Sequence, residues 1–248
     1  MSESALLWRQ YRLERRMFWR NPSAAFFNFL LPLLFLALFG AIFADQQADL
    51  NVIVPGIAGM SIMSTTFSAL AFNMTFLREA GILKRMRGTP LPGVTYLGGL
   101  ILSAVTNALI TLAVILVSGR LLFGIGWPEN WAQLALFTLI GVTCFASLGI
   151  ALSHAIPSFE AAPAYVNAVF LPMIFISGVF YDADNAPNFL RSIAEALPLK
   201  HLIDGYSAAM VSGESLSGLT GSLAVLGLWT AIGIALAIRG FSWDRRAS

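Results

Sequence analysis

Charged residues are scarce in this sequence of 248 residues, of which only 11% are Asp, Glu, Lys or Arg while 57% are hydrophobic. This composition excludes an ordinary soluble domain, in which about a quarter of the residues are charged. Since an apolar helix of about 20 residues crosses the hydrocarbon core of a bilayer, long uncharged runs predict transmembrane helices. Six runs contain neither a charged residue nor a histidine: 21–44, 50–77, 88–119, 130–153, 161–181 and 215–238.

Cysteine and lysine are also rare, and each shortage excludes a kind of chemistry. Cys144 is the only cysteine, which excludes an internal disulfide and a cysteine-based metal site. The only lysines, Lys84 and Lys200, both follow leucine, whereas the phosphate-binding loop of an ATPase ends in Gly-Lys-Ser or Gly-Lys-Thr. We therefore expect no catalytic site, no metal and no cofactor in this chain, and no ATP hydrolysis by this chain alone.

The uncharged runs also bear on the energy source of any transport. A proton- or sodium-coupled carrier usually binds its coupling ion with an ionisable residue near the middle of the bilayer. Here the strongest polar groups near the runs are neutral amides, those of Asn28, Asn73, Asn107 and Asn167. These observations disfavour an ion-coupled carrier, which remains an alternative together with an uncoupled membrane scaffold.

The basic residues predict how the chain sits in the membrane. With six spans, both termini lie on the same side as the segment 78–87, and this side carries 12 of the 15 Lys and Arg residues. By the positive-inside rule it is the cytoplasmic side. We expect a multi-pass protein of a bacterial cytoplasmic (inner) membrane with both termini inside. The net charge of +2 gives no indication of nucleic-acid binding.

We expect an all-α membrane protein that forms one transmembrane domain over 1–248. Residues 5–20 place four arginines on one helical face, which predicts an amphipathic helix that lies flat at the interface and contacts membrane lipids. These arginines are Arg9, Arg12, Arg16 and Arg20. The expected transmembrane helices are 24–44, 53–77, 93–119, 131–153, 161–181 and 216–238.

The outer segment 186–212 is patterned like two short helices separated at Pro198. Apolar residues fall on one face of each helix at spacings of three and four. In the first helix they are Phe189, Leu190, Ile193 and Leu197, and in the second Leu199, Leu202, Ile203, Tyr206 and Met210. Both stripes should pack against apolar surroundings, which favours a re-entrant hairpin in the outer leaflet over a soluble loop.

Hydroxyl side chains form a stripe on the second run. Ser61, Ser64, Thr65, Ser68 and Thr75 share one helical face. They either line a polar-tolerant pathway or let neighbouring helices approach closely, and the sequence leaves both interpretations open.

Residues 78–90, Arg-Glu-Ala-Gly-Ile-Leu-Lys-Arg-Met-Arg-Gly-Thr-Pro, resemble the inner-loop signature of permease subunits of type-2 ABC exporters. In that family the loop forms a coupling helix that docks on the ATPase subunit. The resemblance, with the apolar positions of one continuous helix over 78–87, assigns this role to eleven residues. They are Arg78, Glu79, Gly81, Ile82, Leu83, Lys84, Arg85, Met86, Arg87, Thr89 and Pro90.

A second match lies at 171–181, Leu-Pro-Met-Ile-Phe-Ile-Ser-Gly-Val-Phe-Tyr, followed by Pro187 and by Ala-Leu-Pro-Leu-Lys-His at 196–201. It resembles the fifth span of the family, its Ser-Gly-Val-Phe exit and its outer re-entrant hairpin. The resemblance covers nearly the whole chain and is most like the drug-resistance branch typified by daunorubicin exporters. It implies an external gate at Ser177, Gly178, Val179 and Phe180.

The resemblance implies the type-2 ABC exporter fold and a division of labour. Two permease subunits, identical or different, surround the path, while a separate ATPase subunit binds ATP and Mg and supplies the energy. A path without charges favours a hydrophobic or amphipathic cargo, either a drug or a lipid, and export of a lipid-linked glycan by the same machinery is the alternative. The second and fifth spans would line the path at Ser61, Ser64, Thr65, Phe67, Ser68, Asn73, Asn167, Phe170 and Ile174.

Overall fold

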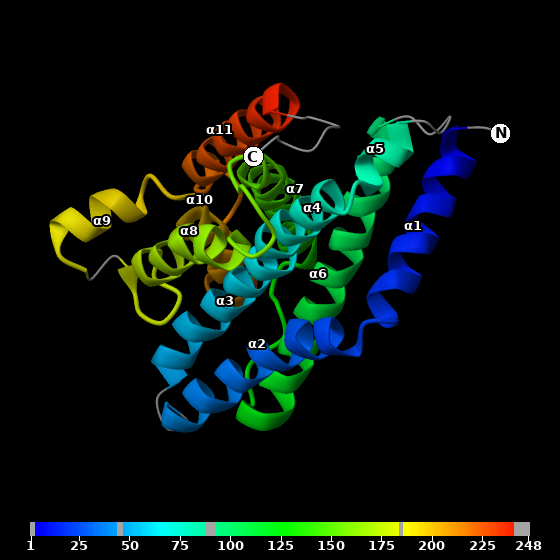
Figure 1. The fold of residues 1–248 in the computed structure, drawn as a ribbon. Helices are drawn as coiled ribbons and strands as arrows, with labels where there is room; N and C mark the ends of the chain where they lie inside the picture. Colours follow the sequence, from blue (N-terminus) through cyan, green and yellow to red (C-terminus); the bar gives the residue numbers. More distant parts are fainter. Residues whose placement is uncertain (1–2, 44–46, 88–92, 184–185, 241–248) are drawn as a thin grey trace.

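The computed structural model describes residues 3–43, 47–87, 93–183 and 186–240. Within these ranges all regular structure is helical, and the helices gather around α3, α4 and α7 (Figure 1). In chain order they are α1 Glu3–Trp19, α2 Pro22–Ile42, α3 Gln47–Met63, the π-helical turn Ser64–Ser68, α4 Ala69–Glu79, α5 Ile82–Arg87, α6 Gly93–Phe123, α7 Trp131–Ser153, α8 Ala162–Ile176, α9 Asn188–Ala194, α10 Pro198–Ser207, a second π-helical turn Ala208–Ser212 and α11 Thr220–Gly240.

Four helical stretches are long and apolar enough to cross a membrane, judged by length and composition. They are Asp49–Glu79, Thr95–Phe123, Trp131–Ser153 and Thr220–Arg239. The first runs from α3 through the π-helical turn into α4. The apolar stretches of α2 and α8 are shorter, Asn28–Ile42 and Ala162–Ile176. The chain is an all-helical, multi-pass membrane protein.

The α3–α4 stretch forms the centre of the bundle and approaches its neighbours closely. α3 packs against α10, where a side chain at Gly59 would meet Leu199 and Ile203. α7 packs against both α4 and α11, and Gly149 of α7 lies directly on the backbone of Phe67. Small residues thus bring these helices together, and the apolar side chains around them form one buried cluster.

Helix α1 lies beside the first half of α6 (Figure 1), and part of this contact is polar. The hydroxyl oxygen of Tyr11 is 3.2 Å from that of Thr106. The guanidinium of Arg15 donates a hydrogen bond to the side-chain oxygen of Asn107. α1 therefore packs on α6 through the side away from Arg9, Arg12, Arg16 and Arg20, all four of which are exposed, and this contact was not part of the expectation of a lipid-bound helix.

The segment after α8 forms two short helices, as the stripes predict, but only the second is covered by this chain. The α10 residues Leu199, Leu202 and Tyr206 are fully buried against α3, α7 and α11. In α9, by contrast, the side chains of Phe189 and Ile193 are 66% and 45% exposed. The first stripe is therefore covered only in part by this chain: Leu190 and Leu197 are half-buried, whereas Phe189 and Ile193 face outward from it.

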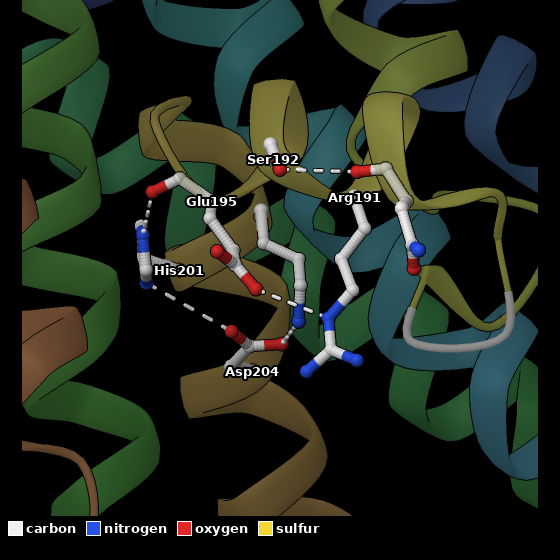
Figure 2. Close-up of polar contacts among 7 residues, drawn as sticks. Arg191, Ser192, Glu195, His201 and Asp204 are labelled. Carbon is white, nitrogen blue, oxygen red and sulfur yellow. Dashed lines mark hydrogen bonds and ion pairs between the residues drawn. The ribbon is translucent and has the colours of Figure 1, made fainter.

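Polar contacts hold the two hairpin helices in place (Figure 2). Arg191 Nε lies 3.1 Å from a carboxylate oxygen of Glu195, and the Glu195 backbone oxygen is 2.8 Å from His201 Nε2. Lys200 Nζ pairs with Asp204 at 2.8 Å. The Arg191–Glu195 pair is about half exposed and therefore contributes little to stability. Lys200 is buried, and its charge would be unfavourable there without Asp204 as its partner.

Candidate coupling surface and transport pathway

The end of α4 that leads into α5 is joined to the end of α7 through Arg78. This residue is 8% exposed, and its guanidinium donates to the carbonyl oxygens of Ser153 at 2.7 Å and Ile156 at 2.5 Å. Carbonyl groups at the end of a helix have no partner within that helix, and a charged donor forms strong hydrogen bonds with them. Arg78 therefore points into the chain and ties α4 to α7.

Glu79 makes a second link, to the turn between α7 and α8. Its Oε2 accepts a hydrogen bond of 2.5 Å from the backbone N–H of Phe159. One turn earlier on α4, the ring of Phe76 contacts the ring of Phe159 edge-on, with centroids 5.6 Å apart. The turn that leads into α8 is thus connected to the end of α4 by a charged acceptor and an aromatic contact.

The helix breaks directly after these two residues. Gly81 has a φ of +67°, a left-handed conformation that residues with a Cβ rarely adopt, and α5 begins at Ile82. The expectation of one continuous helix over 78–87 is therefore wrong. Arg78 and Glu79 end α4, whereas α5 is a separate helix at the same end of the molecule as the first residues of α1 (Figure 1).

Helix α5 has a side that the chain covers and a side that it leaves open. Leu83 is 2% exposed and packs against side chains of α4 and α6, with Ile82 half-buried beside it. Lys84 and Arg85 are exposed. Leu83 is thus unavailable for direct docking, and its burial seats α5 on the bundle. The side chains of Met86 and Arg87, and the residues Thr89 and Pro90, lie outside the described part of the chain.

Part of the hydroxyl stripe is buried in helix packing. Ser61 is fully buried and its hydroxyl donates to the Ile57 carbonyl oxygen at 2.6 Å. Thr65 is 3% exposed and donates in the same way to Ile62 at 3.1 Å. Phe67 is equally buried, against α7. Ser61 and Phe67, which were expected to line the path, are thus both buried between helices in this conformation.

The remaining expected pathway residues are less enclosed. Ser64 and Ser68 are half-buried and begin and end the π-helical turn, a geometry that is frequent at functional sites. On α8, Asn167 is exposed, Phe170 is half-buried and Ile174 is 5% exposed.

A cavity of about 540 Å³ lies between α1, α2, α4 and α6. Two of the expected pathway residues, Thr65 and Asn73, line it, together with Asn28 of α2 and Asn107 of α6. Other parts of the lining are apolar and include the rings of Phe72, Phe76 and Phe159. The cavity combines amide groups with aromatic rings, which suits a molecule that has a polar and an apolar part.

Sequence reasoning did not identify Glu14 as a cavity residue. Glu14 of α1 lines the same space and accepts a hydrogen bond of 2.7 Å from Gln10 Nε2. Burial raises the pKa of the Glu14 carboxyl, and the bond from Gln10 lowers it by a smaller amount. The spacing of four residues between Gln10 and Glu14 places them on one helical face, which is the signal available in the sequence.

Helix α8 ends where the expected gate begins. The helix expected over 161–181 stops at Ile176, because Gly178 adopts a φ of +79° and turns the chain. Ser177 is fully buried at this turn. The hydroxyl of Tyr181 donates back to the carbonyl oxygen of Phe175 at 2.9 Å. The turn is thus closed on itself by a hydrogen bond.

The rest of the gate segment is seated on α2 and α3. The carbonyl oxygen of Val179 lies so close to Gly56 of α3 that a Cβ at this position would overlap it. The ring of Phe180 stacks on Phe39 of α2, with centroids 4.7 Å apart, and also contacts Phe35. The four expected gate residues therefore form one turn, which α2 and α3 hold in place.

Within the described ranges, no three His, Cys, Asp or Glu side chains gather where they would hold a metal ion.

Comparison with known proteins gives a match over most of the chain. A family model described as ABC-2 type transporter matches residues 3–211. The linearmycin resistance permease protein LnrN of Bacillus subtilis is 26% identical over 184 residues, which are 73% of this chain but only 48% of that protein.

Two further relatives are similar over larger shares of their own length. The daunorubicin resistance ABC transporter permease protein DrrB1 of Streptomyces coeruleorubidus is 27% identical over 77% of this chain and 68% of its own. The inner membrane transport permease YadH of Escherichia coli is 21% identical over 70% of each chain. With the family match and the apolar helices, these similarities show that the chain belongs to the ABC-2 type transporter family, as a transmembrane permease.

Proposed function

We propose that this chain is the transmembrane subunit of an ATP-driven exporter, and that a separate ATPase subunit binds ATP and Mg and docks on α5. The observation that carries the proposal is the double link at the inner end of α4. Arg78 holds the end of α7 and Glu79 holds the turn before α8, directly beside the short helix α5 with its exposed Lys84 and Arg85.

This arrangement provides a route for mechanical coupling. A partner that pushes on α5 moves the end of α4, because Leu83 seats α5 against α4 and α6. The end of α4 then carries the α7–α8 turn with it through the hydrogen bonds of Arg78 and Glu79. We propose that the path is lined by α8 and by the second span, which comprises α3, the π-helical turn and α4, so movement at α5 reaches both.

The proposed roles of the coupling residues follow from their positions. Ile82, Lys84 and Arg85 contact the partner, together with Met86, Arg87, Thr89 and Pro90. Arg78, Glu79 and Leu83 position the helix, and Gly81 provides the break. Burial of a small apolar contact contributes more binding free energy than an exposed ion pair does. Ile82 and Met86 therefore provide most of the affinity for the partner, while the charges determine which partner binds.

We further propose six spans, in which α2 and α8 join the four longer stretches and both termini are cytoplasmic in a bacterial inner membrane. The 12 to 3 distribution of basic residues supports this orientation. Helices α9 and α10 form the outer re-entrant hairpin, and the exposed Phe189 and Ile193 of α9 face lipid or a second permease subunit.

The proposed cargo is a hydrophobic or amphipathic compound, either a drug or a lipid. The names of two relatives, which refer to linearmycin and daunorubicin resistance, support a drug-like molecule. A second permease subunit completes the path, with Ser64, Ser68, Asn73, Asn167 and Phe170 toward its centre. The turn at 177–180, seated on α2 and α3, is the external gate.

The proposal is tested by purifying the tagged chain together with the proteins that bind it. We expect a subunit with a Gly-Lys-Ser or Gly-Lys-Thr phosphate-binding loop to co-purify, and cargo to stimulate its ATP hydrolysis.

The double variant Ile82→Ser/Met86→Ser keeps every charge, and we expect it to insert normally but to lose association or stimulated hydrolysis. Leu121→Ser is the matched control, since Leu121 is 77% exposed at the other end of α6. Unchanged stimulation in the double variant contradicts the docking proposal.

A further inference from the structure

The cavity between α1, α2, α4 and α6 has polar groups beyond those expected to line the transport path. Glu14, Asn28 and Asn107 come from α1, α2 and α6, none of which is a proposed path-lining helix. They converge on the same space as Asn73 of α4. Three helices thus supply hydrogen-bonding groups to one cavity of about 540 Å³, which is large enough for a small amphipathic molecule.

Glu14 is the one charged residue among the described residues that line this cavity. Arg15, its basic neighbour, is not among the lining residues, but its guanidinium borders the cavity, where it donates to the side-chain oxygen of the lining residue Asn107 and lies over the rings of Phe18 and Trp19 at 5.6 and 5.8 Å. The Arg15 guanidinium is thus already bound to Asn107, whereas the Glu14 carboxyl is the ionisable group of the described lining itself.

We propose that the polar end of this cavity binds the protonated amine of an amphipathic compound, with Glu14 as the counter-charge and the amides as further hydrogen-bond partners. The inference rests on the proposed export function and names the chemical class of its cargo. A primary amine in this position donates to Glu14 and to amide oxygens at the same time, which a neutral headgroup does less strongly.

The surroundings of these groups support a ligand that brings a positive charge. Burial of Glu14 disfavours its ionised form, and an adjacent ammonium group offsets that cost. The Nδ2 atom of Asn28 is buried with no hydrogen-bond partner among the described residues. As a donor, this N–H group cannot pair with an ammonium group, so it would bind an oxygen acceptor that the compound carries near its amine.

The apolar end of the cavity fits the rest of such a compound. Phe72 and Phe76 of α4 and Phe159 of the α7–α8 turn line it, and the rings of Phe76 and Phe159 are in contact. Aromatic faces accept an apolar tail and also attract a nearby cation. A bound molecule would therefore touch Phe159, the residue whose backbone N–H is bonded to Glu79 at the coupling end.

Binding is measured on the complex of this chain with its ATPase partner in phosphatidylcholine nanodiscs, after subtraction of the signal from empty nanodiscs. The probe is a dodecylamine that carries a dansyl group on its tail, and the comparison compound is the same molecule with an N-acetylated amine. We expect the wild type to bind the amine roughly ten-fold more tightly than the acetylated compound, because only the amine forms an ion-assisted hydrogen bond with a buried carboxylate.

Two variants separate the headgroup from the tail. Glu14→Gln keeps the shape and a hydrogen-bonding group, and we expect it to bind both compounds with affinities within about two-fold of each other, since its charge is gone. Phe76→Ala should weaken the binding of both compounds to the same extent. Glu3→Gln is the control for charge on α1, because Glu3 is exposed and does not line the cavity, and it should leave the ten-fold preference intact.

The outcomes distinguish this inference from the proposed function. Equal binding of the two compounds by the wild type, no binding of either, or an unchanged preference in Glu14→Gln overturns the inference, even where ATP hydrolysis by the complex is normal. Selective binding that depends on Glu14 supports it. Selective binding without any stimulation of ATP hydrolysis supports the amine site and contradicts its use for exported cargo.

Discussion

The ring of Phe180 stacks on the ring of Phe39, with centroids 4.7 Å apart and planes inclined by 22°. These residues lie on the turn after α8 and on α2, so one aromatic pair joins the expected gate to the first of the proposed spans. Phe35 and Phe175 extend the contact on either side of Phe180. Opening of the proposed gate away from α2 would separate this pair.

A double-mutant cycle measures the strength of this contact. We expect Phe39→Ala and Phe180→Ala to be coupled by about 0.5–1.5 kcal/mol, the range for an aromatic pair beyond its burial. The measurement is unfolding of the purified chain by increasing mole fractions of sodium dodecyl sulfate. Pairing Phe39→Ala with Phe189→Ala is the control, since Phe189 lies 66% exposed on α9. A coupling of zero between Phe39 and Phe180 contradicts the gate contact.

The seat of the gate segment on α3 depends on one glycine. Gly56→Ala places a methyl group on the Val179 carbonyl oxygen, and the backbone must move. Overpacking of this kind costs about 1–3 kcal/mol. Gly227→Ala on α11 is the matched control, because nothing lies within 4 Å of a Cβ there. We expect thermal unfolding in detergent to show a lower midpoint for the first variant only, and equal midpoints would mean that Val179 is not held by α3.

Loss of the Arg78 guanidinium should weaken both stability and coupling. Arg78→Ala leaves the carbonyl oxygens of Ser153 and Ile156 without this donor, which we expect to cost roughly 1.5–3 kcal/mol. Arg78→Lys retains the charge but reaches both oxygens less well, so its stability and its coupling should lie between those of the wild type and of Arg78→Ala. The readouts are unfolding in detergent and cargo-stimulated ATP hydrolysis of the complex. If Arg78→Ala keeps full stability and stimulation, the link between α4 and α7 has no mechanical role.

The protonation of Glu14 predicts a pH dependence of stability. Burial raises the carboxyl pKa in the folded chain above its ordinary value of 4.5, so the folded state binds the proton more tightly than the unfolded state does. The resulting stabilisation is present below pH 4.5 and is lost as the pH rises through the folded-state pKa. Without ligand, Glu14→Gln should therefore be more stable than the wild type at pH 7.5.

This difference between Glu14→Gln and the wild type should shrink as the pH falls toward 4.5. It is measured as the difference in thermal midpoint in detergent from pH 4.5 to 7.5, with Glu3→Gln as the exposed control on the same helix. A variant that is less stable than the wild type at pH 7.5 would show that the buried carboxylate is compensated by partners that we have not identified.

The re-entrant hairpin predicts a distinct labelling pattern. In a Cys144→Ala background, Glu195→Cys should react quickly with an impermeant maleimide on intact cells, and Ile203→Cys should not, since Ile203 is 7% exposed. The informative position is Phe189, whose side chain is exposed from the chain. If α9 lies in the outer leaflet, Phe189→Cys is also protected, because lipid excludes the reagent. Labelling as fast as that of Glu195→Cys would place α9 in water.

Much of the helical framework could be predicted from the distribution of charge. Helix α7 begins where Asn130 follows Glu129, and the Asn130 side chain accepts from the backbone N–H of Gln133 as an N-cap. The stripe of α10 was likewise predictable, because Leu202 and Tyr206 recur at helical spacing and both are buried. These features depend on residues close together in the chain.

The features that were missed depend on residues far apart in the chain. Arg78 fits the sequence pattern of an exposed basic cluster, yet its partners are Ser153 and Ile156, about 75 positions away. The packing of α1 on α6 includes contacts of Tyr11 with Thr106 and of Arg15 with Asn107, which no local pattern predicts. The break at Gly81 was visible as a glycine, but helical spacing on both sides of it favoured one continuous helix.

ATP-driven movement of a fluorescent amphiphile into inside-out vesicles that contain the chain and its ATPase partner tests the central proposal most directly. We predict that accumulation requires hydrolysable ATP, continues in the presence of a protonophore and is abolished by Ile82→Ser/Met86→Ser but not by Leu121→Ser. Accumulation without ATP that follows an imposed proton or sodium gradient would contradict the account and identify an ion-coupled carrier instead.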